Sequence, residues 1–311
     1  WRAAGSHGGV SFLRIPRDIA RINAMHASWA TLAYAPPPMY NISAVSLRDA
    51  GLQQGRLARE RIRGWLGTTE MTELAEYAIT GEGQVAFRQL KADNTRFAPL
   101  LVGELEGVAS GAEVPLDLIW VATMINELES LRAFPPGNAT AATTTLAAAG
   151  PRQSAPAATV ASLTGKPAGH CSDISARPRG GGGGHGHNED WPGPIRAFWY
   201  LASYTALPGA DFSSCAGVVY PGGLVGWAAS WNEHGLYLTQ NSLFPTANRP
   251  AGLVAAFAQR ASLCGLGGAG RSPRQLDALA ARLTDSTRRP LERRAAGPGP
   301  GPGPGPGPGP G

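Results

Sequence analysis

The chain has 311 residues, a formal net charge of +5 at pH 7, and many glycines (42) and prolines (27). Its arginines, such as Arg56, Arg59 and Arg63, are spread along segments with helical periodicity, and no basic run is interleaved with aromatic residues. This pattern argues against nucleic-acid binding. No stretch approaches the roughly 18 consecutive apolar residues of a membrane span, so we expect no membrane partner.

Composition divides the chain into five parts. We expect an unassigned N-terminal segment, a helical part, an insertion of low complexity, a core with strands, and a disordered tail of alternating Gly and Pro. Because the chain starts with Trp1, we expect it to be a fragment of a longer protein. In that order the parts are residues 1–45, 46–132, 133–168, 169–290 and 291–311.

The second part has apolar residues at three- to four-residue spacing, which predicts helices. Gly51 and Gly55 lie four residues apart in the first of them and indicate a close approach to another helix rather than a break. Pro115 suits the first turn of the last helix. The predicted helices are residues 46–67, 69–79, 84–91 and 99–111, and 115 to about 131.

The core begins with two predicted antiparallel strands, residues 171–177 and about 184–190, joined through a run of glycines. After Trp191 the apolar pattern has a period of two, which is typical of strands. The sequence Asn232-Glu233-His234-Gly235 predicts a turn between the last two strands. The later strands are predicted near 197–204, 212–220, 224–231 and 236–243, and two helices near 252–263 and 272–283.

The segment from Gly169 to Trp191 carries the most chemistry, because it places Cys171 at the start of one strand and a polar cluster at the end of the next. A thiol attacks a carbonyl only as thiolate, and its usual pKa is about 8.5. An α-amino group, with a pKa of about 7.7–8.0, is a base suited to neutral pH. A cut before Cys171 would therefore put nucleophile and base on one residue.

The cysteine count agrees with a functional thiol. The chain has three cysteines, which are too few to predict a disulfide framework, and an odd number favours a thiol with a chemical role. The three are Cys171, Cys215 and Cys264.

Several motifs resemble the acyl-coenzyme A:6-aminopenicillanate acyltransferase family of N-terminal-nucleophile hydrolases. Residues 103–116 resemble its Glu-Leu-x-Gly-x-Ala-x-Gly signature. Asn-Glu-Asp-Trp at 188–191, Asn-Glu-His-Gly-Leu at 232–236 and Asn-Ser-Leu-Phe-Pro at 241–245 also resemble the family. The resemblance implies an α+β fold, a four-layer αββα sandwich, with residues 169–290 as a catalytic core that is incomplete at the C-terminus.

The resemblance also implies roles for individual residues. Cys171 would be the nucleophile, and the chain would cut itself between His170 and Cys171. Asp190 would orient the new amine close to Cys171. From the residues themselves, Asn188 and Asn241 are candidates to contact the substrate, with hydrogen bonds to turn or strand backbone as the alternative. Glu189 is expected to be solvated, because it points away from its two neighbours on a strand.

Two departures from the family stand out. The penicillin-forming acyltransferase has glycine before its cysteine, whereas this chain has His170. The family's Thr-Asn-His motif, which supplies an oxyanion-hole asparagine, has no match here. We therefore expect a complete version of the protein to cleave itself and this form to stay uncleaved.

The sequence thus predicts an amidohydrolase or acyltransferase that acts on a small amide or acyl thioester. No cofactor is expected, since acyl-coenzyme A would enter as a substrate, and the two processed pieces would stay associated. Two alternatives remain. One is a metal-dependent hydrolase using His185 and His187, although no third ligand has a convincing spacing and no metal is included in the main prediction. The other is a catalytically degenerate relative.

Overall fold

The structure is a computed structural model that describes residues 36–133, 171–176, 183–189, 191, 193–241 and 250–264. Several predictions lie outside these residues. They are the absence of regular structure at 136–167 and 297–311, the helix at 272–283, and the positions of His170 and Asp190.

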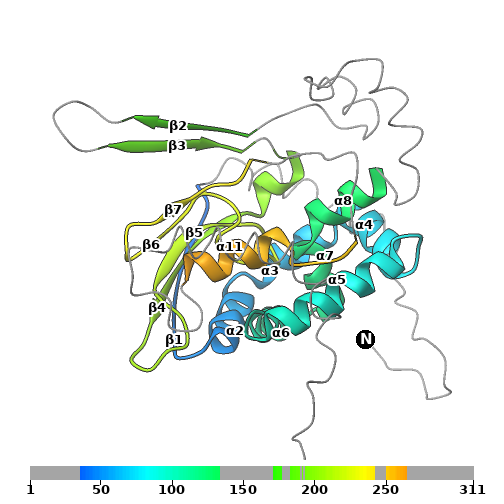
Figure 1. Ribbon diagram of the computed structural model, residues 1–311, viewed down its shortest axis with the longest axis horizontal. Helices are drawn as coiled ribbons and strands as arrows, with labels where there is room; N and C mark the ends of the chain where they lie inside the picture. The colour runs from blue at the N-terminus through cyan, green and yellow to red at the C-terminus, as the bar shows by residue number, and fades with distance from the viewer. Residues whose placement is uncertain are drawn as a thin grey trace, which may run out of the picture.

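The described residues form a mixed α/β structure that is compatible with the predicted α+β class. A five-stranded sheet has the order β1-β4-β5-β6-β7, in which β1 and β4 are parallel and the later pairs are antiparallel. The helices gather on one side of this sheet, and the β2–β3 hairpin forms a second, two-stranded sheet (Figure 1). The strands are β1 (Met39–Ala44), β2 (Ser172–Ala176), β3 (Gly184–Asn188), β4 (Tyr200–Ala206), β5 (Cys215–Val219), β6 (Ser230–Asn232) and β7 (Tyr237–Leu238).

Most of the predicted helices are present, with some boundaries moved. The first predicted helix is two helices, because Ala58 leaves helical geometry at φ −99° and ψ 11°. The helix predicted from Pro115 is likewise split at Met124. The helices are α2 (Leu47–Leu57), α3 (Arg59–Leu66), α4 (Thr69–Ile79), α5 (Gln84–Phe97), α6 (Pro99–Ala112), α7 (Leu116–Thr123), α8 (Ile125–Ala133), the 3₁₀ helix η1 (Gly193–Ala197) and α11 (Ala255–Leu263).

The strand predictions are less accurate. Residues 224–229 turn instead of extending, since Gly226 has a φ of +117°, so only the short β6 remains of that predicted strand. The prediction for 197–204 starts too early, because η1 precedes β4. In the segment left unassigned, Met39–Ala44 forms β1. The turn at Asn232–Gly235 is confirmed, with Gly235 at a φ of +79°.

Helices α2 and α6 pack almost backbone to backbone. Gly51 and Gly55 on α2 face Gly107 and Gly111 on α6, and a Cβ atom built at any of the four would lie 2.1–2.3 Å from a carbonyl oxygen of the facing helix. Real Cβ atoms essentially never come that close to another heavy atom. The close approach predicted from Gly51 and Gly55 is therefore confirmed.

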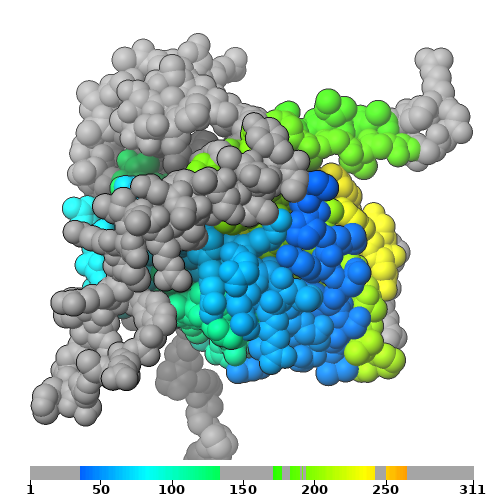
Figure 2. Space-filling view, turned by 180° about the vertical axis from the view of Figure 1, so that it is seen from behind, coloured from blue at the N-terminus to red at the C-terminus, as the bar shows by residue number. Residues whose placement is uncertain are grey.

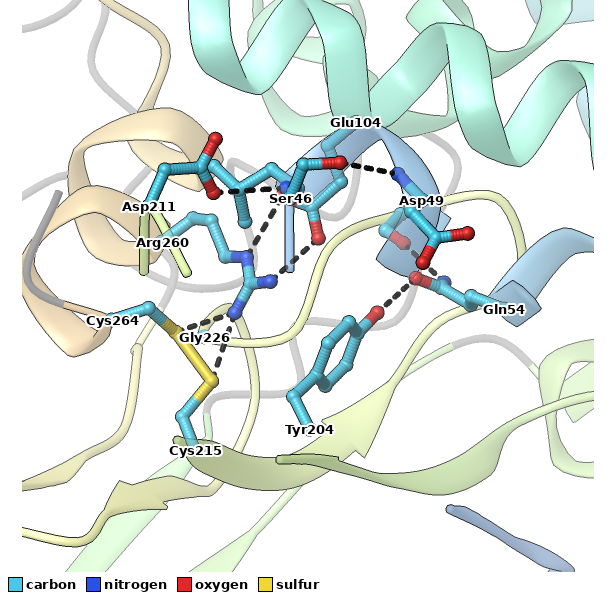
Figure 3. A network of polar contacts seen from close by, with 12 residues as sticks. Ser46, Asp49, Gln54, Glu104, Tyr204, Asp211, Cys215, Gly226, Arg260 and Cys264 are labelled. Carbon is cyan, nitrogen blue, oxygen red and sulfur yellow. Dashed lines mark hydrogen bonds and ion pairs between the residues drawn. A yellow bond between two sulfur atoms is a disulfide. The ribbon is translucent and has the colours of Figure 1, made fainter. Parts of the chain in front are cut away.

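A buried ion pair joins α6 and α11 to the sheet (Figure 3). Arg260 donates two hydrogen bonds to Glu104, at 3.0 and 2.6 Å, and both side chains have no solvent exposure. The guanidinium carbon also lies 4.5 Å from the ring centroid of Tyr204. Burial acts to lower the pKa of Arg260, but attraction to Glu104 outweighs it and raises the pKa, so the guanidinium stays charged.

The same arginine contacts a disulfide. Cys215 on β5 is bonded to Cys264 just after α11, and their Cα atoms are 6.0 Å apart. Nη1 of Arg260 donates to both sulfurs. The expectation that the cysteine count argues against disulfides is therefore wrong, because the docking of α11 on the sheet brings these two cysteines together. Cys171 is the cysteine outside this bond.

Candidate nucleophile site on the β2–β3 hairpin

The register of the β2–β3 hairpin determines which side chains of the site lie next to one another. Asp173 pairs with His187, and Ser172 pairs with Asn188, in an antiparallel ladder. The prediction of two adjacent antiparallel strands here is confirmed for the described residues. The hairpin projects from the body in Figure 1, and the view from behind in Figure 2 shows the same. Side chains on such a ladder alternate between faces, so Cys171, Asp173, His187 and Glu189 share one face.

This shared face carries a connected polar cluster. Nδ1 of His187 lies 2.8 Å from an Asp173 oxygen, and Nε2 lies 2.7 Å from Oε1 of Glu189. The thiol of Cys171 donates to Oε2 of Glu189 at 3.7 Å. The imidazole is 2% exposed, while the carboxylates of Asp173 and Glu189 are 34% and 26% exposed. The thiol is thus linked to a carboxylate, and that carboxylate to a buried histidine.

The electrostatics of the cluster favour an imidazolium between two carboxylates. Burial acts to lower the pKa of His187, but the hydrogen bonds to Glu189 and Asp173 outweigh it and raise the pKa. For Asp173, slight desolvation acts to raise the pKa, yet hydrogen bonds from His187, Thr239 and Asn241 lower it. Each group therefore stabilises the charged form of its neighbour.

The segment around β7 fixes the hairpin. Asn241 donates to Oδ2 of Asp173 at 2.6 Å. The ring of His185 stacks on Tyr237, with centroids 5.2 Å apart and an interplanar angle of 20°. Nδ1 of His185 also lies 2.7 Å from Oγ of Ser175. The contacts of His185 are thus with Tyr237 and Ser175 and not with the thiol. This geometry gives no support to a metal site formed by His185 and His187.

A different set of side chains has the arrangement of a metal site. Among the described residues, one ligand atom each from Cys171, His187 and Glu189 lie within 4.8 Å of one another. These are a thiol, an imidazole and a carboxylate, which are the ligand types that zinc prefers. In the described part of the chain, this is the one group of three histidine, cysteine or carboxylate ligands at such a spacing.

Aromatic side chains flank the cluster. Trp191 stacks on Tyr220 with centroids 5.1 Å apart, and Trp227 meets both rings edge-on. Burial, and next the negative charge of Glu189, raise the pKa of Tyr220 far above its ordinary value. Its phenol is therefore neutral, and the three rings form an apolar wall beside the polar cluster.

The structure brings only part of the predicted site together. Cys171 is partly buried within the cluster, and Asn241 reaches it through Asp173. Asn188 alternates to the opposite hairpin face, where its Oδ1 accepts from the backbone N–H of Ser172 at 2.8 Å. The contacts of Asn188 and Asn241 with substrate stay predictions. His170 and Asp190 lie outside the described residues, so their roles stay predictions too.

Asp173 is a site residue that was not predicted from the sequence, and Glu189 has a different environment from the one expected. The expectation that Glu189 is solvated is wrong, because it bonds to both His187 and the thiol. The available signal was the register of the hairpin. Once residues 172 and 188 are paired, the alternation of side chains puts Glu189 opposite Cys171.

No protein-family model and no curated protein matches the chain. Of the described helices, none is long and apolar enough to cross a membrane.

Proposed function

We propose that the protein is a self-processing cysteine N-terminal-nucleophile amidohydrolase or acyltransferase with Cys171 as its nucleophile. The observation that carries the proposal is the contact between the Cys171 thiol and Glu189, 3.7 Å apart, within a cluster that also holds His187. A thiol next to a base that is itself oriented by a third group is the arrangement that activates a nucleophile.

The self-cleavage step uses this contact. In the uncut chain Cys171 has no free α-amine, and the carboxylate of Glu189 is the base that its thiol contacts. The thiol proton passes to Glu189, and the thiolate attacks the carbonyl carbon of His170. The peptide C–N bond breaks, and its nitrogen takes the proton to become the α-amine of Cys171. Water then hydrolyses the thioester, which frees the carboxylate of His170 and returns the thiol.

Turnover repeats the chemistry on a substrate. The α-amine of Cys171 takes the thiol proton, the thiolate attacks an amide or thioester carbonyl, and the leaving amine or thiol takes the proton. Water or an amine then accepts the acyl group from Cys171. In this proposal Asp190 orients the new ammonium, and the partly exposed ring of Trp191, which stacks on the buried Tyr220, offers an apolar surface to the acyl chain.

The proposal extends to the fold and the partners. We propose that the described sheet, with helices on one side, is one half of a four-layer αββα sandwich. We propose that the complete protein has the other half and that its two processed pieces stay associated. The substrate is a small amide or acyl thioester, which includes acyl-coenzyme A, and no resident cofactor takes part.

Two rival functions make different predictions. A metal-dependent hydrolase would lose activity with a chelator, whereas the proposed enzyme would not. A hydrolase that uses His185 and His187 as metal ligands is also disfavoured, because His185 contacts Tyr237 and Ser175 and not the cluster. A degenerate relative would remain uncut and inactive even when complete.

The test is to trap the acyl-enzyme. Protein made from the complete coding sequence is mixed with a panel of small amides and acyl thioesters, quenched in acid and digested for mass spectrometry. We expect acyl groups on Cys171, no turnover in Cys171→Ala, and slow cleavage with poor turnover in Cys171→Ser. Ser175→Ala, on the same hairpin face, is the matched control and should turn over normally. Turnover by Cys171→Ala would overturn the proposal.

A further inference from the structure

We propose that Cys171, His187 and Glu189 together bind a zinc ion. The inference rests on three side chains whose ligand atoms lie within 4.8 Å of one another, and not on the proposed acyl chemistry. A thiolate and an imidazole with one carboxylate suit Zn²⁺, whereas Mg²⁺ and Ca²⁺ favour oxygen ligands throughout.

The distances are close to those that zinc requires. Tetrahedral zinc with its usual bond lengths holds its sulfur, nitrogen and oxygen ligands about 3.4–3.6 Å apart. The sulfur of Cys171 lies 3.7 Å from Oε2 of Glu189, which already fits. Nε2 of His187 lies 2.7 Å from Oε1 of Glu189, because a hydrogen bond now joins them. The two distances involve different oxygens of Glu189, so the partly exposed carboxylate has to rotate until one oxygen lies about 3.4–3.6 Å from both the sulfur and Nε2, which makes room for the ion.

The orientation of His187 is an independent observation that points to a metal. Its Nδ1 bonds to Asp173 at 2.8 Å, which leaves Nε2 directed at the other two ligands. Metal-binding histidines almost always have such a partner on the second nitrogen, because it fixes the ring and strengthens the ligand. Asp173 is itself held by Asn241 at 2.6 Å. The side chains that support a zinc ligand are thus in place behind it.

Zinc binding displaces protons from the cluster. Zinc replaces the proton on Nε2 of His187 and the proton on the thiol of Cys171, so two protons leave as a doubly charged ion enters. Three protein ligands leave a fourth position for water.

Zinc would have a regulatory effect if the proposed function also holds, and this consequence alone rests on it. A thiolate bound to zinc shares its electron pair with the ion, so it is no longer available to attack the carbonyl of His170. Zinc would therefore keep the uncut chain uncut, and a chelator would release it for processing.

The experiment measures binding of the metal alone. The purified chain, without reducing agent so that Cys215–Cys264 stays closed, is titrated with Zn²⁺ against a chromophoric chelator. We expect one ion per chain, with binding lost in Cys171→Ala and His187→Ala. Asp173→Asn keeps all three ligands and should bind about 10- to 100-fold more weakly. Substituted Co²⁺ should give a thiolate charge-transfer band that is absent in Cys171→Ala.

His185→Ala is the matched control, because His185 lies two residues away on the same hairpin face but is engaged with Tyr237 and Ser175. It should bind zinc as tightly as the unaltered chain. Circular dichroism of each variant checks that it folds. If a variant of a ligand residue does not fold, Asp173→Asn still tests the site, because it keeps all three ligands. The inference would be overturned if Cys171→Ala and Asp173→Asn bound zinc as tightly as the unaltered chain, or if the unaltered chain did not bind one zinc ion per chain. Zinc binding without acyl transfer would overturn only the proposed function.

Discussion

Replacing Gly107 with alanine should destabilise the protein, although alanine is the better helix former. A Cβ atom at Gly107 would lie 2.2 Å from the carbonyl oxygen of Arg48 and 2.7 Å from the amide nitrogen of Leu52. Ordinary contacts begin near 3.4 Å, so α2 and α6 would have to separate by roughly 1 Å. The obstructing atoms belong to the backbone of α2, which no rotamer change can move aside.

The two opposing contributions have different sizes. Overpacking costs about 1–3 kcal/mol, and rigid backbone on both sides favours the upper end. Replacing glycine with alanine inside a helix stabilises the helix by about 1 kcal/mol. The expected net loss is therefore about 2 kcal/mol in the free energy of unfolding. At a typical urea dependence this lowers the unfolding midpoint by about 1 M.

Gly103→Ala is the matched control, four residues earlier on the same helix. Its Cβ atom would meet only the Cβ of Arg48, at 3.8 Å, which is an ordinary contact. Only the helix preference then changes, so we expect a gain of up to about 1 kcal/mol. Urea denaturation of the two variants, followed by circular dichroism, gives the comparison. A Gly107→Ala variant as stable as Gly103→Ala would refute the backbone-to-backbone packing.

The buried network around Arg260 leads to two further predictions. Glu104→Gln should lower the free energy of unfolding by about 3–5 kcal/mol in thermal denaturation, because it leaves the guanidinium unpaired in the core. Replacing Glu104 and Arg260 together with apolar residues should cost less, and a double variant as unstable as Glu104→Gln would contradict the ion-pair argument. Reduction of Cys215–Cys264, which lie 49 residues apart, should cost about 2–4 kcal/mol. Unchanged urea midpoints with and without dithiothreitol would argue against that bond.

Local signals in the sequence predicted much of the helical part. The helix at Thr69–Ile79 has the predicted bounds, and the spacing of Gly51 and Gly55 correctly indicated a close helix contact. The glycines on the opposite helix, Gly107 and Gly111, were not identified as the partners. A residue pattern gives the face that a helix buries, but not which helix covers it.

Features that depend on distant partners could not be predicted in this way. Strand β1 pairs in parallel with β4, with Met39 opposite Leu201, so its hydrogen bonds come from a segment far along the chain. Cys215 meets Cys264 only because α11 docks on the sheet. Such contacts are set by packing, and nothing in the local sequence marks them.

The candidate site shows the same division. The hairpin and the position of Cys171 follow from local patterns, and both are present. To predict that Glu189 takes part, one needs the register between the two strands. The alternation of side chains within either strand alone does not give that register. Asp173 contacts His187 and Asn241, and these three residues come from three separate segments.

The N-terminal sequence of the processed protein tests the central claim most directly. Protein made from the complete coding sequence should separate into two pieces, and the C-terminal piece should begin Cys-Ser-Asp-Ile, the residues that start at Cys171. Intact mass should give the sum of the two pieces as the full chain plus one water. Glu189→Gln should slow the cut, and Cys171→Ala should abolish it. An active protein that remains a single uncut chain would contradict the account.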